Sequence, residues 1–375
     1  MKSRSTLLYI AIPFCLRDSF CEGTPLFYGS KESKATYLNT LQSELENIIA
    51  QEDLQGREIA AVHFGGAAPS IMNADRLGQL ALFLRRNLPL ATGCPFSLKA
   101  LPQTIGTPSL SAWGVGNFNQ IELDVLSLQP DELIRLNTSY RVANIQNAIL
   151  FLDKFRYHSV STRLMYGIKG QALSDWKKTL RSCLHLEPHH VTVTPSPYEN
   201  GEGWTSNEST LIEFYEFAQS YLMEKGYKQK TMQTFSRRES YQSYTTLALE
   251  GADIMGVGAG ARSHLYGYRY QNTCSFDAYI DAYHDFTKII ENVFEEDEAT
   301  QQISGICNDL ALLRSFTMTA SLAEPTRDFV NTLTENALVD QQGDDITLTS
   351  KGAVLWPSLY TPEGIPEYFR LSTLL

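Results

Sequence analysis

Apolar residues follow two alternating patterns through the first two thirds of the chain. Short continuous apolar runs predict buried strands, and stretches in which apolar residues recur every three or four positions predict amphipathic helices. Their alternation is typical of βα units that build a parallel sheet. The six expected strands span residues 7–12, 59–64, 96–100, 120–126, 159–165 and 190–194. We therefore predict an α/β fold, a partial, TIM-like (β/α)6 barrel.

Two of the expected helices have a well-defined apolar face. The first lies between the first two strands, and its apolar positions are Tyr37, Leu38, Leu41, Leu45, Ile48 and Ile49. Glu44 and Glu46 are expected off that face or at its margin. The second covers residues 207–225 through Leu211, Phe214, Tyr215, Ala218 and Leu222. Gly226 follows it in the position of a C′ residue, and both helices should pack outside the sheet.

The βα rhythm weakens after Ser236, and the rest of the chain follows a different pattern. An acidic run at residues 291–298 predicts a solvated boundary before a C-terminal unit. Two helices and two hairpin strands are expected beyond it, at residues 309–317, 326–336, 337–340 and 345–349. We predict three segments, which are a barrel at 1–235, an extension with the acidic linker at 236–298, and a helical, winged-helix-like unit at 299–375.

Composition narrows the range of functions. The chain has 375 residues, 43% of them hydrophobic, which is enough for one large domain and a smaller one. Its formal net charge of −11 argues against a nucleic-acid partner, because phosphate binding needs a basic surface. The first apolar run is only a strand's length and is broken by Pro13, so neither a signal peptide nor a membrane span is predicted, and we expect a cytoplasmic protein. Six scattered cysteines predict mostly buried thiols rather than a disulfide framework.

Four short motifs occur in order along the chain. They read LYIAIPFC at residues 8–15, FGGAAPS at 64–70, YGIKGQ at 166–171 and GVGAGARS at 256–263. In this order they resemble motifs of the oxygen-independent coproporphyrinogen III oxidase family (HemN/HemW type) of radical SAM proteins. The resemblance implies a radical SAM barrel with a C-terminal helical or winged-helix-like extension. It also implies a [4Fe–4S] cluster and S-adenosylmethionine as the cofactors of the family.

The cluster motif departs from its usual form in this chain. Family members hold the cluster with three cysteines in C-x3-C-x2-C spacing, because soft thiolates bind iron well. Cys15 occupies the first ligand position, Ser19 the middle one, and Cys21 comes one residue early. Cys15 and Cys21 are therefore interpreted as vestigial metal positions. Ser19, Glu22 or a distant cysteine could supply a third ligand, which leaves an atypical cluster as the alternative.

Other cofactor positions implied by the resemblance have also changed their chemistry. Lys99 stands where a hydrogen-bond-accepting Glu is expected, and Arg163 replaces an Asp. Leu126 replaces a Gln, and Thr138 replaces an Arg. Because these changes converge on one pocket, we expect a lost cofactor site and no radical catalysis. The degenerate S-adenosylmethionine site should comprise Tyr9, Phe20, Gly65, Gly66, Ala67, Gly258 and Ala259. Its glycines are expected mainly to close tight turns.

The resemblance also supplies the candidate ligand, haem or a porphyrin, since family members act on or carry tetrapyrroles. Candidate contacts are His63 and His264 as axial ligands. Arg163 and Arg262 are the candidate partners of propionates. The haem-carrier signature H-N-x-x-Y-W is absent from the aligned residues 244–249, and the local sequence is closer to the haem-utilisation branch (ChuW/HutW type).

Three hypotheses for function follow. The leading one is a catalytically degenerate HemN/HemW-type protein that handles haem or porphyrin by binding it, with no resident cofactor. The second is a radical SAM enzyme of porphyrin oxidation or haem degradation that uses an atypical cluster. The third is a regulatory partner of an active paralogue or of a haem-utilisation protein. A new anion site requires Lys99 and Arg163 to meet in one pocket, where two cations would need an anionic partner.

Overall fold

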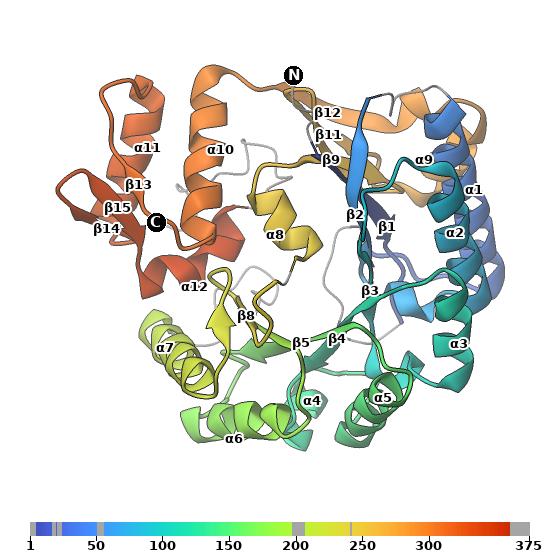
Figure 1. Ribbon diagram of the computed structural model, residues 1–375, viewed down its shortest axis with the longest axis horizontal. Coiled ribbons are helices and arrows are strands. Elements are labelled where there is room, and N and C mark those ends of the chain that lie inside the picture. Colours follow the sequence, from blue (N-terminus) through green and yellow to red (C-terminus); the bar gives the residue numbers. More distant parts are fainter. Residues whose placement is uncertain are drawn as a thin grey trace.

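A curved parallel sheet forms the centre of the molecule (Figure 1). The computed structural model describes residues 5–16, 20, 25–50, 56–196, 207–240 and 242–360. All six predicted strands are present, as β1 (Ser5–Ile12), β2 (Glu58–Gly66), β3 (Phe96–Ala100), β4 (Gln120–Leu126), β5 (Ser159–Tyr166) and β6 (His190–Pro195). They pair in sequence order, each parallel to the next. A further strand that was not predicted, β9 (Asp253–Val257), pairs in parallel with the other side of β1.

Shorter antiparallel strands extend the same sheet at both ends. β10 (Arg262–Leu265), β11 (Tyr268–Asn272) and β12 (Ile290–Glu295) continue it beyond β9, and β8 (Thr234–Ser236) and β7 (Lys228–Gln229) continue it beyond β6. The order across the sheet is β12-β11-β10-β9-β1-β2-β3-β4-β5-β6-β8-β7. The strands follow an arc around the barrel interior (Figure 1). This arrangement confirms the predicted partial barrel of the α/β class.

Helices pack against the outside of the curved sheet, as predicted (Figure 1). They are α1 (Lys31–Ala50), α2 (Ala74–Asn87), α3 (Thr107–Val115), α4 (Pro130–Arg135), α5 (Val142–Lys154), α6 (Leu173–Leu184) and α7 (Glu208–Glu224). α7 buries the five apolar residues that the sequence placed on one face, and Gly226 after it has a φ of +85°. α1 differs from its prediction at Glu44, which was expected beside the apolar face and is buried and hydrogen-bonded.

The C-terminal unit combines helices with a small antiparallel sheet. Its elements are α10 (Glu298–Ala311), β13 (Phe316–Thr317), α11 (Glu324–Glu335), β14 (Val339–Gln342), β15 (Asp345–Leu348) and α12 (Ser350–Leu359). The second predicted helix and the hairpin are confirmed, but the helix predicted at 309–317 is wrong. α10 begins earlier because Asp297 caps it, accepting a hydrogen bond from Thr300 N (2.8 Å). The acidic run is not wholly solvated either, since Glu296 is buried beside Arg269.

Two short helices complete the barrel. α8 (Tyr244–Leu249) contacts β1 and β2 and lies within the ring of elements in Figure 1, and α9 (Phe276–Asp281) contacts α1. Single turns of 3-10 helix span Pro69–Ile71, Pro102–Thr104, Ala282–His284 and Phe286–Ile289. The main apolar core lies between the sheet and the outer helices, where Trp113 and Trp176 are fully buried. Within the described ranges, no helix combines the length and apolar character that crossing a membrane requires.

Candidate functional site

The barrel interior holds a polar cavity of about 320 Å³. Charged and ring-bearing side chains from β1 to β5 form one part of its wall, and these are Tyr9, His63, Lys99, Glu122, Asp124 and Arg163. Hydroxyl-bearing side chains form another part, and these are Ser161, Thr192, Thr194, Thr231, Thr234, Ser243 and Thr245. Parallel βα folds bind ligands at the carboxyl ends of their strands, so this cavity is the first candidate for a functional site.

Lys99 and Arg163 meet in this cavity, as a new anion site requires. Arg163 Nε lies 2.7 Å from Asp124 Oδ1, and Lys99 Nζ lies 3.6 Å from Asp124 Oδ2. Lys99 Nζ also donates to Gly66 O (3.2 Å). Burial raises the pKa of Asp124, but the two cations outweigh burial and hold that pKa below its usual value. One carboxylate therefore faces two cations, and Glu122, which also lines the cavity, brings the formal charge of these four side chains to zero.

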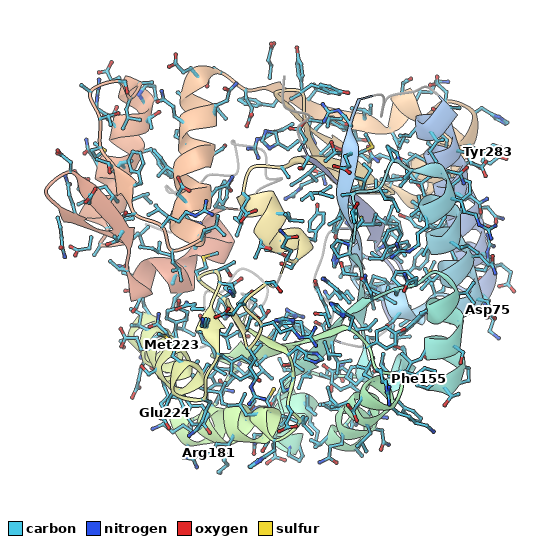
Figure 2. The ribbon with its side chains drawn as sticks, in the orientation of Figure 1. Asp75, Phe155, Arg181, Met223, Glu224 and Tyr283 are labelled. Atoms are coloured by element: carbon cyan, nitrogen blue, oxygen red, sulfur yellow. The ribbon has the colours of Figure 1, made fainter. Side chains whose placement is uncertain are left out.

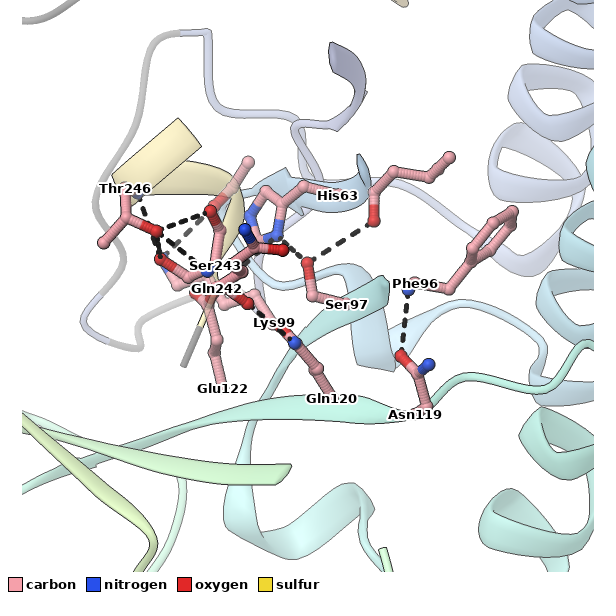
Figure 3. A network of polar contacts seen from close by, with 12 residues as sticks. His63, Phe96, Ser97, Lys99, Asn119, Gln120, Glu122, Gln242, Ser243 and Thr246 are labelled. Atoms are coloured by element: carbon pink, nitrogen blue, oxygen red, sulfur yellow. Dashed lines mark hydrogen bonds and ion pairs between the residues drawn. The ribbon is translucent and has the colours of Figure 1, made fainter. Parts of the chain in front are cut away.

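His63 lines the same cavity, where Ser97 contacts it (Figure 3), and two aromatic rings also pack beside it. Its Nδ1 lies 2.7 Å from Ser97 Oγ and 3.9 Å from Glu122 Oε1. Burial lowers the pKa of His63 despite the nearby Glu122 carboxylate. Its ring packs beside those of Tyr9 and Tyr244, with centroids 5.7 and 5.3 Å away. His63 is therefore a neutral imidazole of fixed orientation near neutral pH.

A hydrogen bond from β4 holds the residues just before α8 beside the cavity. Gln120 Nε2 donates to Gln242 O (3.0 Å; Figure 3). Ser243 Oγ accepts from Thr246 N (3.1 Å), and Thr246 Oγ1 accepts from Ser243 N (2.9 Å), which forms a capping box. Thr245 of the same helix lines the cavity. α8 is also the stretch that the sequence analysis aligned with the haem-carrier signature, so that stretch lies beside the cavity.

The glycine motifs close tight turns beside the carboxyl end of β1. Gly66 has a φ of +103° and Gly258 a φ of +102°, a region that side chains rarely adopt. A Cβ on Gly66 would lie 2.5 Å from Ile12 O, and one on Gly258 would lie 2.6 Å from Ala11 O. Ala67 N donates to Ile12 O (3.2 Å). These close approaches give both loops a structural role.

Glu44 on α1 is a buried polar residue, and the prediction that it lies off the apolar face or at its margin did not anticipate this burial. Its Oε2 accepts from Gly258 N (2.9 Å) and Tyr279 OH (2.6 Å), and its Oε1 accepts from Asn272 Nδ2 (3.1 Å). Burial raises the pKa of Glu44 to about 7, although the three donors act in the opposite direction. Glu44 is buried because β9, β11 and α9 bring these donors to α1, a tertiary arrangement that helical periodicity does not encode.

Tyr37, about two helical turns before Glu44 on the same helix, extends this network. Its hydroxyl donates to Ala11 O (2.8 Å) and accepts from Ala259 N (3.0 Å). The N–H groups of Gly258 and Ala259, two candidate cofactor contacts, are therefore already bonded to side chains of α1.

The remaining candidates are distributed over different parts of the fold. Phe20 packs against the main apolar core. Gly65 sits where a Cβ would lie 2.6 Å from the ring of Tyr9. Arg262 and His264 lie on β10 and are not among the described residues that line the cavity. Of the four candidate substrate contacts, the structure therefore brings together only His63 and Arg163.

His264 instead belongs to an ion-pair cluster that joins the barrel to α10. Its Nε2 lies 2.8 Å from Glu296 Oε2, and Arg269 Nε lies 2.6 Å from Glu296 Oε1. Arg269, which is fully buried, also donates from Nη2 to Ser304 Oγ on α10 (2.9 Å). Burial raises the pKa of Glu296, but His264 and Arg269 hold it below its usual value. The position of His264 indicates a structural role.

The described residues do not provide the ligands of a [4Fe–4S] cluster. Cys15 is buried and disulfide-bonded. Ser19, Cys21 and Glu22, the other positions considered for the cluster, lie outside the described residues. Across the described ranges, no three His, Cys, Asp or Glu side chains are placed together to hold a metal ion.

S-adenosylmethionine also fits the cavity poorly. The resemblance places carboxylates at positions 99 and 163, whereas Lys99 and Arg163 present only donors. Leu126, where the resemblance places a Gln, is buried with a φ of +59°. Thr138, in place of an Arg, is buried and donates to Tyr140 O (2.9 Å). None of these four side chains supplies the group that the resemblance expects for this cofactor.

Comparisons with known proteins agree with the motifs. No family model matches the chain. The haem chaperone HemW of Escherichia coli is 24% identical over 262 residues, which cover 68% of each chain. The mitochondrial radical S-adenosyl methionine domain-containing protein 1 of Danio rerio is 26% identical over 266 residues, 68% of this chain and 59% of that protein. The oxygen-independent coproporphyrinogen III oxidase of Cereibacter sphaeroides is 22% identical over 302 residues, 73% of this chain and 66% of that protein.

A solved structure gives the same answer for the fold. Coproporphyrinogen III oxidase (HemN) from Escherichia coli, described as a radical SAM enzyme, matches with a TM-score of 0.77 over 95% of this chain and 89% of its own, at 18% sequence identity. The fold is therefore an α/β barrel like that of HemN. Together with the sequence relatives, it supports a relationship to the HemN/HemW-type family.

Proposed function

We propose that this protein binds haem or a related porphyrin through its carboxylates and carries out no radical chemistry. The observation that carries the proposal is that Lys99 and Arg163 share the carboxylate of Asp124 in the barrel cavity. Both cations stand where the resemblance expects acceptors for S-adenosylmethionine. At these two positions the cavity offers donors, which suit an anionic group of a ligand and cannot accept the hydrogen bonds of S-adenosylmethionine.

The names of the relatives supply the ligand class, since they include a haem chaperone and a coproporphyrinogen III oxidase. Both tetrapyrroles carry carboxylate side chains. A guanidinium pairs with a carboxylate through two parallel N–H bonds, so Arg163 is the candidate for that contact and Lys99 adds a point charge. A volume of about 320 Å³ is at the low end for ligand sites. We infer that the cavity receives the carboxylate-bearing edge of the ring.

Titration of the full chain with haem and with coproporphyrin III, followed by absorbance, tests the proposal. Arg163→Gln and Lys99→Gln should each weaken binding about tenfold or more, because a hydrogen bond to a charged group contributes about 1.5–3 kcal/mol. Lys288→Gln is the matched control, since Lys288 is an exposed cation outside the cavity, and it should leave binding unchanged. A wild-type chain that binds neither ligand, or binding that R163Q and K99Q leave unchanged, would contradict the proposal.

Anaerobic reconstitution with iron and sulfide separates this proposal from the radical enzyme. We expect negligible iron, because Ser19 takes the middle position of the cysteine motif and Cys15 is disulfide-bonded. Uptake of about four irons per chain together with cleavage of S-adenosylmethionine would favour an enzyme with an atypical cluster. If neither iron nor porphyrin binds, the hypothesis of a regulatory partner is favoured.

A further inference from the structure

A separate pocket lies at the amino-terminal ends of the strands β3 to β6. Residues at or just before the start of each of these strands line it, together with Arg238, Ser240 and Gln242 from the loop between β8 and α8. We call it the base pocket. Phe155, labelled in Figure 2, follows α5 and comes shortly before the lining residue His158. The volume of the base pocket is about 230 Å³, which is below the usual range for drug-sized ligands and suits a smaller molecule.

The lining of the base pocket offers positive charge. Arg238 is its cation, and none of the described residues that line it is Asp or Glu. The surroundings are positive as well. Burial lowers the pKa of His190, which lines the pocket, to about 3, and the nearby His189, Arg238 and Lys230 lower it further. The base pocket therefore favours a ligand with negative charge, although the whole chain has a formal charge of −11.

Arg238 is held in place at both ends, and most of its donors remain available. Its backbone N donates to Ser236 Oγ (2.9 Å), and Ser236 Oγ also lies 2.9 Å from His190 Nδ1. At the other end, Nη1 donates to His158 O. A guanidinium has five N–H groups, and within the described residues the others of Arg238 have no protein partner. Because the side chain is only half-buried, a ligand can reach these donors.

Asn119, just before β4, presents a second donor to the base pocket. Its Oδ1 accepts from Phe96 N (3.0 Å; Figure 3), which assigns Nδ2 as the donor end of the amide. Nδ2 has no hydrogen-bond partner within the described residues, and the side chain is partly exposed. Ser159 and Ser240 add hydroxyl groups to the lining. Donors therefore come from the starts of β4 and β5 and from the loop after β8.

We propose that the base pocket binds a small tetrahedral oxyanion, which is phosphate, either free or as the terminal group of a small molecule. The guanidinium of Arg238 pairs with two of its oxygens, and Asn119 Nδ2 donates to another. The hydroxyls of Ser159 and Ser240 are further donors. A tetrahedral anion suits donors that come from several segments better than a carboxylate does, because the acceptors of a carboxylate lie in one plane.

Acidic residues near the base pocket restrict the size of the anion. Asp153 and Glu187 line an adjoining groove, which also contains Arg238, but they do not line the base pocket. Glu239, which follows Arg238 in the chain, is paired with Lys228 at 2.5 Å. A long polyanion that extended beyond Arg238 would meet these carboxylates, whereas a compact anion does not. The base pocket and the barrel cavity have no lining residue in common, so this inference goes beyond the proposed function.

Calorimetric titration of the full chain with sodium phosphate tests the inference, and it should show saturable binding that sodium chloride at equal ionic strength does not give. Arg238→Gln and Asn119→Asp should each weaken binding of phosphate about tenfold or more. Asn119→Asp keeps the oxygen that accepts from Phe96 N and replaces the Nδ2 donor with a charged acceptor. Arg237→Gln is the matched control, because Arg237 packs over the ring of Tyr227, does not line the pocket and should leave binding unchanged.

Further titrations identify the source of the phosphate and exclude the barrel cavity. Tighter binding of glycerol 3-phosphate than of phosphate would identify the terminal group of a small molecule, and equal or weaker binding would identify free phosphate. Arg163→Gln, in the barrel cavity, should leave binding of phosphate unchanged. R238Q changes a half-buried side chain, so it tests the inference even if N119D fails to fold. No saturation below about 10 mM phosphate, unchanged affinity in R238Q, or binding lost in R163Q or R237Q would each overturn the inference.

Discussion

Asp124 on β4 and Arg163 on β5 stand opposite each other in the register of the sheet, and their Oδ1 and Nε atoms are 2.7 Å apart. Lys99 reaches the same carboxylate from β3, at 3.6 Å. The three residues form one charge cluster across three neighbouring strands, next to a wall of hydroxyl groups. Because the side chain of Asp124 is only 8% exposed, its charge is what allows the two cations to share this space.

Asp124→Asn should lower the free energy of unfolding by about 3 kcal/mol, since removing one partner of a buried ion pair leaves uncompensated charge. The double variant D124N/R163Q should lose less than the sum of the two single variants, because the second change removes the cation that the first one left unpaired. Chemical denaturation of the four proteins measures both effects. A loss below about 1 kcal/mol in D124N would show that solvent already screens the cluster.

Glu44→Gln should remove a pH dependence of stability. The pKa of Glu44 rises from 4.5 to about 7 on folding, so the folded state binds more protons than the unfolded state between these values. The free energy of unfolding should therefore fall as the pH rises through this window, by about 3 kcal/mol in total. Denaturation curves at several pH values should show this slope in the wild type and in E46Q, an exposed control on the same helix, but not in E44Q. An equal slope in E44Q would assign it to another group.

Glu296→Gln should detach the C-terminal unit from the barrel. Arg269 is fully buried, and its charge is paired with Glu296 at 2.6 Å. Loss of that partner should cost about 3–5 kcal/mol. Hydrogen exchange should then speed up in α10, whose Ser304 also contacts Arg269, more than in β3 and β4. Glu298→Gln, at the exposed start of α10, is the control and should change exchange little.

Gly258→Ala should destabilise the fold by about 2 kcal/mol or more. Gly258 has a φ of +102°, and a Cβ there would meet Ala11 O at 2.6 Å. Gly343→Ala is the matched control, because Gly343 has a φ of +67° but a Cβ added there would meet no atom within 4 Å. It should cost only the backbone strain, about 1 kcal/mol. Thermal denaturation of both variants gives the comparison, and equal losses would mean that the turn at Gly258 relaxes.

The parallel strands could be predicted because strands buried on both faces are continuous apolar runs. β9 was missed because its short run, Asp253–Val257, merges with a glycine-rich motif and carries a glycine of its own. The helix at 309–317 was misplaced because an acidic run resembles a linker, whereas Asp297 uses its carboxylate as a cap. In both cases the prediction rested on local composition, whereas strand pairing or helix capping determines the observed structure.

Part of the candidate site could also be predicted from the sequence. Strand ends in a parallel barrel converge, so the meeting of Lys99 and Arg163 could be anticipated from their positions. Their partner Asp124 was not singled out, because strand register, which sequence does not state, decides which carboxylate faces them. Cys94, Cys183 and Cys307 are buried free thiols as predicted, but the disulfide of Cys15 departs from that pattern.

β1 pairs with one strand that is near it in the sequence and one that is distant. Among the described strands, β1 is synthesised before the others. One of its two neighbours in the sheet, β9, follows β2 to β8 in the sequence, and Thr6 of β1 is paired with Asp253 of β9. While the chain is growing on the ribosome, β1 has one open edge until residues of β9 emerge. Such non-local pairing slows folding and leaves a strand edge exposed to aggregation. The protein should therefore complete its barrel only late in translation. Until β9 has been synthesised, the nascent chain is a candidate for protection by chaperones.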